Sequence, residues 1–138
     1  MKTYNCLFCG EVCNRGHSKV NKYCSNICQG NYTWEHMTKP AIVAGTLSCH
    51  NITAFKKYLI ETKGETCALC GIPPTWNGKS LTLQLDHIDG NSDNNFPSNL
   101  QLLCPNCHTQ TDTFGSKGVG SRYKKTAKRN IYLQQYKN

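Results

Sequence analysis

The clearest hydrophobic pattern in the chain begins at residue 81. Leu81, Leu83 and Leu85 alternate with polar residues, which is the period of a strand with one buried face. Asp86 ends this predicted strand on its polar face. A loop rich in Gly, Asn and Asp follows, and the leucines within residues 100–103 predict a second short strand. The two segments together predict a pair of strands joined by a polar loop.

A short helix is predicted directly after the second strand. It should start in the segment from Pro105 to Cys107 and run through His108 to about Thr113. His108 and Asp112 stand four positions apart, so they would share one face of this helix.

A longer amphipathic helix is predicted over residues 51–63. Its apolar stripe consists of Ile52, Phe55, Leu59 and either Tyr58 or Ile60. Asn51 or Thr53 would cap its start, and Gly64 would end it. We expect this stripe to pack in the core and the helix to lead the chain toward Cys67.

The patterns divide the chain into four parts. These are a small zinc module at residues 1–30, a connector at 31–50, a core at 51–115 and a basic tail at 116–138. Trp34 would anchor a short helix in the connector, whereas Pro40 and Gly45 should break regular structure there.

Cysteines are the main candidate staples of this short chain. There are 10 of them among 138 residues, of which only 38% are hydrophobic, so the core is small for a domain. The N-terminus has no apolar signal region, and no long apolar run predicts a membrane span. We therefore expect a cytoplasmic protein with reduced thiols, in which paired cysteines are interpreted as metal ligands.

Two CxxC pairs predict one structural zinc site. Its ligands would be Cys67, Cys70, Cys104 and Cys107. Gly71 and Pro105 fit the tight turns that such pairs need. A reversible dithiol is the weaker alternative, because redox motifs normally have a single CxxC.

The N-terminal cysteines predict a second structural zinc. The assigned ligands are Cys6, Cys9, Cys24 and Cys28. Cys13 is the spare cysteine, although a site that uses both Cys9 and Cys13 stays open. Cys49 has no partner in sequence and should pack as a small apolar residue.

The positive charge of the chain is concentrated at its C-terminal end. The net charge is +8, and residues 113–138 hold seven Lys/Arg and no acidic residue. A basic segment with interleaved tyrosines suits a polyanion such as nucleic acid, whereas the simpler alternative is a solvated tail. The candidate contacts to nucleic acid are Lys117, Arg122, Lys124, Lys125, Lys128 and Arg129.

The string LDHIDGN, followed by DN and then NLQLLCPNCHTQTDTF, resembles the HNH endonuclease family, particularly small phage-type homing endonucleases with an N-terminal zinc module. The resemblance covers residues 4–115. It implies an α+β fold in which a ββα-metal core, similar to a treble clef, is stapled by zinc. It also implies DNA as the partner and hydrolysis of phosphodiester bonds as the reaction.

The resemblance also implies roles for four residues. His87 would be the general base, while Asp86 and His108 would bind one catalytic divalent cation, Mg²⁺ or Mn²⁺. Asn99 would hold the loop and orient the base. Asp112 would be either a further ligand or a solvent-facing residue.

Two functions therefore compete. The first is a metal-dependent DNA endonuclease, in which the zinc module and the tail choose the target. The second is a zinc-stapled nucleic-acid-binding protein without catalysis. The sequence leaves open the target site, nicking against double-strand cleavage, the catalytic metal, and whether the protein is a monomer or a homodimer.

Overall fold

A computed structural model describes residues 3–14 and 22–115, and the chain divides into two compact units, residues 1–41 and 42–138. The predicted nucleic-acid contacts of the tail, from Lys117 to Arg129, lie outside the described residues. None of the helices in the described ranges is long and apolar enough to cross a membrane.

The N-terminal unit combines a small hairpin with a helix. Strands β1 (Thr3–Asn5) and β2 (Val12–Asn14) pair antiparallel. Helix α1 (Asn26–Thr33) begins after Ser25, whose hydroxyl accepts a hydrogen bond from the backbone N–H of Cys28. This cap explains why a helix starts directly after the Tyr23-Cys24-Ser25 segment.

Helical structure continues beyond α1 through a π-helical turn (Trp34–Thr38) and α2 (Lys39–Val43). The predicted break at Pro40 is wrong, because this residue lies inside α2. In the turn before it, the N–H of Lys39 bonds to the carbonyl of Trp34, five residues back. The chain instead leaves the helix near Gly45, whose φ of +67° suits glycine.

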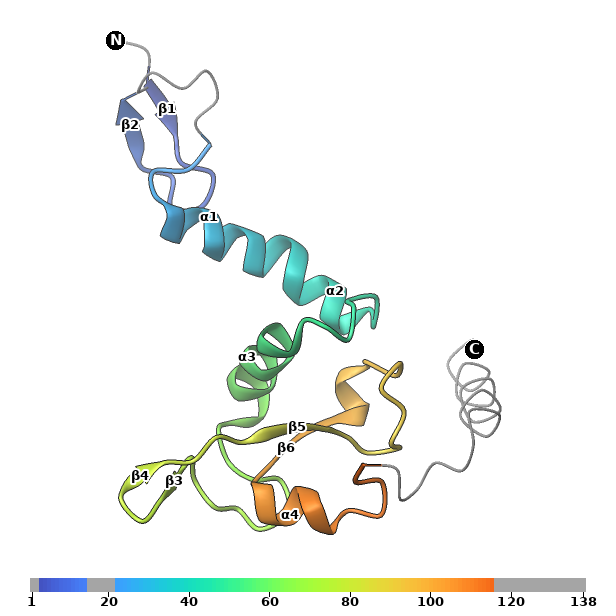
Figure 1. Ribbon diagram of the computed structural model, residues 1–138. Helices are drawn as coiled ribbons and strands as arrows, with labels where there is room; N and C mark the ends of the chain where they lie inside the picture. The colour runs from blue at the N-terminus through green and yellow to red at the C-terminus, as the bar shows by residue number, and fades with distance from the viewer. Residues whose placement is uncertain (1–2, 15–21, 116–138) are drawn as a thin grey trace. The chain divides into compact units, whose positions relative to one another are not determined.

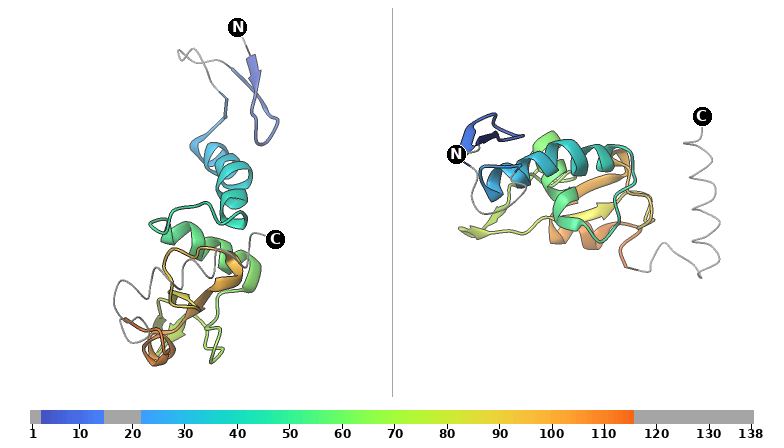
Figure 2. Two further views of the ribbon diagram at one scale, coloured as in Figure 1. Left: turned by 90° about the vertical axis from the view of Figure 1, so that its right-hand side faces the viewer. Right: turned by 90° about the horizontal axis from the view of Figure 1, so that it is seen from above.

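Beyond the end of α2, the described part of the second unit consists of helices, a helical turn and two further strand pairs. Its elements are α3 (Ile52–Lys63), β3 (Thr75–Trp76), β4 (Lys79–Ser80), β5 (Gln84–His87), the 3₁₀ turn η2 (Pro97–Asn99), β6 (Leu100–Leu103) and α4 (Pro105–Gln110). Strands β5 and β6 pair antiparallel, with α3 against one face and α4 against the other (Figures 1 and 2).

The buried face of α3 forms much of the core. Phe55 and Leu59 are each 1% exposed, and Leu100 and Leu103 of β6 are equally well buried. Two lysines of α3 also bind the second unit's backbone, and Nζ of Lys56 donates to the carbonyl of Leu83 at 2.7 Å. Phe55 and Leu59 thus pack in the core as the stripe predicts, but Ile52 is 51% exposed and Asn51 makes no side-chain cap.

Two boundaries in this unit differ from the prediction. The strand expected from Leu81 begins at Gln84, because the N–H of Leu81 bonds to the carbonyl of Pro74 beside the β3–β4 hairpin. Helix α4 ends at Gln110, and Thr111 is extended with ψ of 147°. His108 and Asp112 therefore do not share a helical face.

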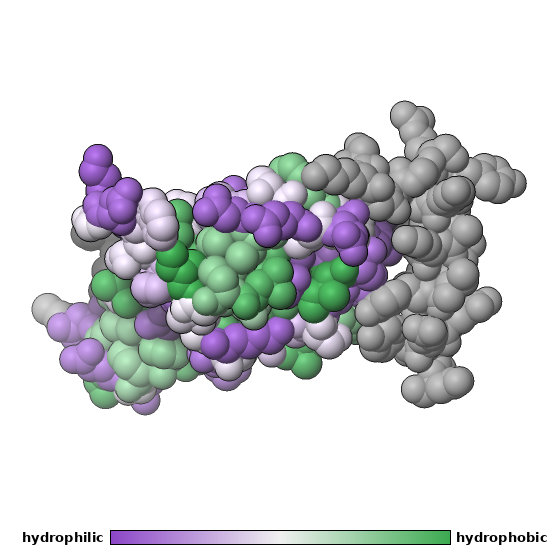
Figure 3. Space-filling view, turned by 90° about the horizontal axis from the view of Figure 1, so that it is seen from below, coloured by the Kyte–Doolittle hydropathy of each residue, from purple (hydrophilic) through white to green (hydrophobic). Residues whose placement is uncertain are grey.

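Large hydrophobic side chains remain on the surface of this unit. Leu69, Trp76 and Ile88 are each more than half exposed. Figure 3 shows a group of hydrophobic residues in the middle of the face seen from below, bordered by hydrophilic ones. Such surface is common in small proteins, and it indicates that the core needs further support.

We expect Leu59→Ala to lower the free energy of unfolding by about 2–5 kcal/mol, because it empties a fully buried site. Ile60→Ala is the matched control on the same helix, where the side chain is 37% exposed. Urea denaturation in the presence of zinc measures both. Equal losses for the two variants would contradict the core described for α3.

Candidate active site and metal centres

Four cysteine side chains meet where the β5–β6 hairpin joins α4. The Sγ atoms of Cys67, Cys70, Cys104 and Cys107 all lie within 4.8 Å of one another. Gly71, at φ +73°, closes the first turn by donating its N–H to the carbonyl of Cys67 at 2.9 Å. Cys104 follows β6 directly and caps α4, so the two CxxC turns face each other across the end of the strand pair.

The electrostatics of this group favour a cation. Burial raises the pKa of Cys67, but backbone N–H groups of Cys70, Cys104 and Leu69 outweigh it and bring that pKa to about 6. Side-chain hydrogen bonds from Cys70 and Cys104 hold the pKa of Cys107 at about 12 instead. The lowered pKa of Cys67 favours its thiolate, whose negative charge a soft metal ion would neutralise.

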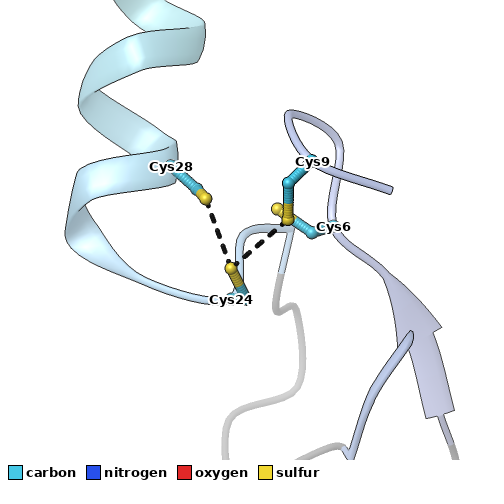
Figure 4. A group of neighbouring side chains, drawn as sticks. All are labelled: Cys6, Cys9, Cys24 and Cys28. Carbon is cyan, nitrogen blue, oxygen red and sulfur yellow. Dashed lines mark hydrogen bonds between the residues drawn. The ribbon is translucent and has the colours of Figure 1, made fainter. Parts of the chain in front are cut away.

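The second cysteine group repeats this arrangement in the N-terminal unit. Figure 4 shows the thiols of Cys6, Cys9, Cys24 and Cys28 pointing toward a common centre from the β1–β2 turn and the start of α1, and their Sγ atoms also lie within 4.8 Å of one another. Backbone hydrogen bonding from Cys9 lowers the pKa of Cys6 to about 6. The thiol of Cys13 points elsewhere, toward the carbonyl of Glu11 at 3.5 Å. The geometry thus selects Cys9 over Cys13.

The sulfur spacing fits zinc in both groups. Tetrahedral bonds of about 2.3 Å place two sulfurs about 3.8 Å apart. The Sγ atoms of Cys70 and Cys104 are 3.8 Å apart, and those of Cys9 and Cys24 are 3.6 Å apart, while Cys24 and Cys28 are closer, at 3.3 Å. Each group could therefore hold one metal ion, whereas Cys49 belongs to neither group.

Asp86 and His108 face each other between β5 and α4. Asp86 is 6% exposed, and its Oδ1 lies 3.5 Å from Nε2 of His108. The other carboxylate oxygen accepts a 2.8 Å hydrogen bond from Gln101, its partner across the strands. The other ring nitrogen of His108, Nδ1, is hydrogen-bonded to Oε1 of Gln84.

At 3.5 Å, Oδ1 of Asp86 and Nε2 of His108 are close enough to bind one ion, although farther apart than two ligands at right angles. Two ligands at right angles, with bonds of about 2.1 Å, lie about 3 Å apart. Carboxylate oxygen suits Mg²⁺ and Mn²⁺, whereas imidazole nitrogen suits transition metals such as zinc, iron and nickel. Asp112 is exposed, and it does not join Asp86 and His108 in a group of close ligand atoms within the part of the chain that the structure describes.

His87 is the residue next to Asp86, and successive side chains of a strand point to opposite faces. Its Nε2 lies 3.1 Å from Oδ1 of Asn95, a loop residue that is 6% exposed. Among the described residues, His87 also joins no group of three close ligand atoms. His87 therefore contacts the loop residue Asn95 and is not grouped with Asp86 and His108.

Asn99 lies in a hydrogen-bond network within the loop between the strands. Its Nδ2 donates to Oδ1 of Asp89 and to the carbonyl of Asn94, each at 2.9 Å, while its Oδ1 accepts from the N–H of Asp89. Its carbonyl accepts from the N–H of Ile88, next to His87. The buried Asn99 side chain therefore fixes the turn immediately after β5.

Sequence reasoning missed three side chains that contact the site residues, namely Gln84, Asn95 and Gln101. Gln84 stands two positions before Asp86, so strand alternation already places it on the same face. The position of Gln101 opposite Asp86 depends on the register of the two strands, which the sequence does not specify. For Asn95, in a loop with several similar residues, the sequence offers no distinguishing signal.

Comparison with known proteins identifies this region. Residues 67–113 match the family model for HNH endonucleases. A 64-residue segment is 44% identical to the H-N-H endonuclease F-TflIV of Escherichia phage T5. That segment covers 46% of this chain and 28% of the phage protein. No solved structure matches the chain. The chain thus carries an HNH endonuclease domain, together with two cysteine groups that could hold zinc.

We expect Cys9→Ser to reduce the zinc content of the purified protein from about two ions per chain to about one. Cys13→Ser should leave it unchanged, because the Cys13 thiol lies outside the group. Elemental analysis by mass spectrometry measures the ratio. A loss of zinc in Cys13→Ser with full content in Cys9→Ser would contradict the assignment.

Proposed function

We propose that this protein is a metal-dependent DNA endonuclease that hydrolyses phosphodiester bonds. The observation that carries the proposal is the approach of Asp86 Oδ1 and His108 Nε2 to 3.5 Å within a domain that matches the HNH endonucleases. The phage relative is itself described as an H-N-H endonuclease, and the matched segment includes less than a third of its length.

Asp86 and His108 would hold the catalytic divalent cation, with Mg²⁺ and Mn²⁺ as the favoured ions. When bound, this ion would neutralise charge on the phosphate and on the leaving 3′ oxygen. Gln101 donates a hydrogen bond to Oδ2 of Asp86, and Oε1 of Gln84 is hydrogen-bonded to Nδ1 of His108. These contacts keep Oδ1 of Asp86 and Nε2 of His108 oriented toward each other. The two cysteine groups would hold structural zinc.

His87 would act as the general base that takes a proton from the attacking water. A neutral imidazole can accept this proton, and histidine is the side chain that most often plays this role. Asn99 would keep this base in place through the turn after β5, since its carbonyl binds the N–H of Ile88. Neither Asn99 nor His87 is assigned to the metal.

The attraction to DNA would come from outside the catalytic core. Residues 42–115 hold four Lys/Arg and six Asp/Glu, a balance of −2. Residues 1–41 hold five Lys/Arg and two Glu, a balance of +3, and residues 116–138 add seven Lys/Arg without acids. Binding to a polyanion therefore falls to the zinc module and the tail, which would also choose the target, as in a homing-type enzyme.

The N-terminal unit offers side chains for such contacts. An open hollow of about 450 Å³ lies beside the cysteine group. The polar and aromatic residues that line it include Tyr4, Lys22, Tyr23, Asn26 and Gln29. Asparagine, glutamine and lysine can bind base edges or phosphates, so this hollow is the candidate contact surface of the module.

The alternative function is a zinc-stapled protein that binds nucleic acid without cleaving it. It would use the same zinc module and tail, but it would not need a carboxylate facing an imidazole between β5 and α4. Cleavage assays separate the two functions directly, and the same assays distinguish nicking from double-strand cleavage.

We expect His87→Ala to lower the rate of DNA cleavage with Mg²⁺ or Mn²⁺ by about 10²–10⁴-fold, the usual contribution of a general base. His50→Ala is the matched control, because His50 is an exposed histidine outside β5, α4 and the loop between the strands. Conversion of supercoiled plasmid measures both rates. Wild-type cleavage by His87→Ala would refute this role, and an inert wild-type protein that still binds DNA would favour the alternative function.

We expect neutralisation of four tail residues to weaken DNA binding with little change in sequence preference. The variant replaces Lys124, Lys125, Lys128 and Arg129 with glutamine. The slope of log K against log salt should fall by up to about 0.9 for each lost phosphate contact. The control variant carries the same replacement at Lys57 and Lys79, two exposed lysines outside the tail. An unchanged slope in the tail variant would show that the tail does not contact phosphates.

A further inference from the structure

The residues that follow α4 fold back over the candidate site. Thr111 makes the first turn, because its N–H and its hydroxyl both donate to the carbonyl of His108, at 3.3 and 3.0 Å. A second turn closes where the N–H of Phe114 donates to the carbonyl of Thr111 at 3.2 Å. The two turns bring Thr113 and Phe114 back to the site, where both residues are half-buried.

We propose that Thr113 and Phe114 are positioning residues of the candidate active site. Phe114 holds the imidazole of His108, and Thr113 holds the turn that follows His87. This inference rests on the proposed function for the roles of the two histidines, whereas the contacts themselves do not depend on it. Phe114 lies directly after the matched residues 67–113, so the likeness to the family assigns it no role.

The rings of Phe114 and His108 meet edge to face. Their centroids are 5.1 Å apart and their planes are 88° apart, which is one of the preferred arrangements of two aromatic rings. Gln84 and Asp86 contact the two nitrogen atoms of the imidazole. The perpendicular ring of Phe114 adds a contact that limits rotation of the imidazole about its Cβ–Cγ bond. It therefore helps to keep Nε2 of His108 directed at Oδ1 of Asp86.

Thr113 packs against Gly90, in the turn after β5. Gly90 has a φ of +70°, and its N–H donates to the carbonyl of His87 at 2.8 Å. A β-carbon at Gly90 would lie 2.7 Å from Cγ2 and 2.9 Å from Cβ of Thr113, closer than a β-carbon normally approaches another atom. Thr113 thus occupies the space that a side chain at position 90 would need. Thr113 and the Asn99 network both contact this turn.

One short segment therefore contacts both parts of the site. The proposed ligand His108 lies on α4, whereas the proposed base His87 lies at the end of β5. Their relative placement depends on what connects α4 to the turn after β5. Residues 111–114 supply such a connection through two adjacent side chains.

Mn²⁺ affinity of the full-length, zinc-loaded protein, measured by calorimetry, tests the role of Phe114. Phe114→Leu keeps an apolar side chain but removes the ring, so it should weaken Mn²⁺ binding by about 2–10-fold, the range that an aromatic pair is worth. Phe114→Tyr keeps the ring and should bind Mn²⁺ as the wild type does. Phe8→Leu, the same replacement at an exposed position of the N-terminal unit, is the control.

Two further readouts separate positioning from a general loss of structure. Excess Mn²⁺ should restore the cleavage rate of Phe114→Leu, with the KM for DNA unchanged, because the ring acts through His108 alone. The nuclear Overhauser spectrum should connect the ring protons of residue 114 with those of His108 in the wild type and in Phe114→Tyr.

A double-mutant cycle tests the role of Thr113. The β-carbon of Gly90→Ala would displace Thr113, so kcat at saturating Mn²⁺ should fall by about 10–100-fold, as expected for a small misplacement of a catalytic group. Thr113→Gly removes both obstructing atoms, so the double variant should cleave faster than the product of the two single effects predicts. Gly64→Ala is the matched control, because Gly64 has a φ of +86° but a β-carbon there would meet none of the described residues within 4 Å.

Wild-type Mn²⁺ affinity in Phe114→Leu, or no ring-to-ring signal in the wild type, would overturn the role of Phe114. Purely multiplicative effects of Gly90→Ala and Thr113→Gly would overturn that of Thr113. Zinc content and the amide spectrum identify a variant that fails to fold, and the ring-to-ring signal of the wild type then decides.

Failure of the proposed function has a different signature. The wild-type protein would then cleave no DNA, yet it would still show the signal between the two rings. The coupling between Gly90→Ala and Thr113→Gly would still appear in urea unfolding.

Discussion

The antiparallel register of β5 and β6 determines which strand residues of the candidate site face α4. With Asp86 opposite Gln101 and Gln84 opposite Leu103, these four side chains share the face that α4 covers. His87 is opposite Leu100 at the end of β5, where the strand runs into the loop that carries Asn95. A slip of one residue would turn Asp86 away from α4 and separate it from His108.

The cysteine group at the end of the hairpin connects the paired strands to α4. Cys104 directly follows the last residue of β6 and caps the helix that carries His108. The first CxxC turn is attached to the same strand, since the N–H of Ala68 donates to the carbonyl of Leu102 at 2.8 Å. A bound metal would lock strand, turn and helix together, and a core of this size gains most from such a staple.

The elements that carry the chemistry were predictable because each depends on a local signal. The CxxCG turns, the stripe of α3 and the Cys-Pro start of α4 follow from spacing alone. The β3–β4 hairpin also has a local signal that was missed, an Asn77-Gly78 turn in which both residues have positive φ. A single sequence does not specify tertiary neighbours. These neighbours determine the later start of β5, the helical environment of Pro40 and the contacts of Asn95.

The central claim is that Asp86 and His108 hold one divalent ion while His87 stands apart from it as the base. A crystal structure of the protein with Mn²⁺ and a DNA duplex, using the anomalous signal of manganese, tests it most directly. The account predicts a peak between Oδ1 of Asp86 and Nε2 of His108, with His87 directed at the phosphate and outside the coordination shell. A manganese peak at His87, or DNA bound with no peak between Asp86 and His108, would contradict it.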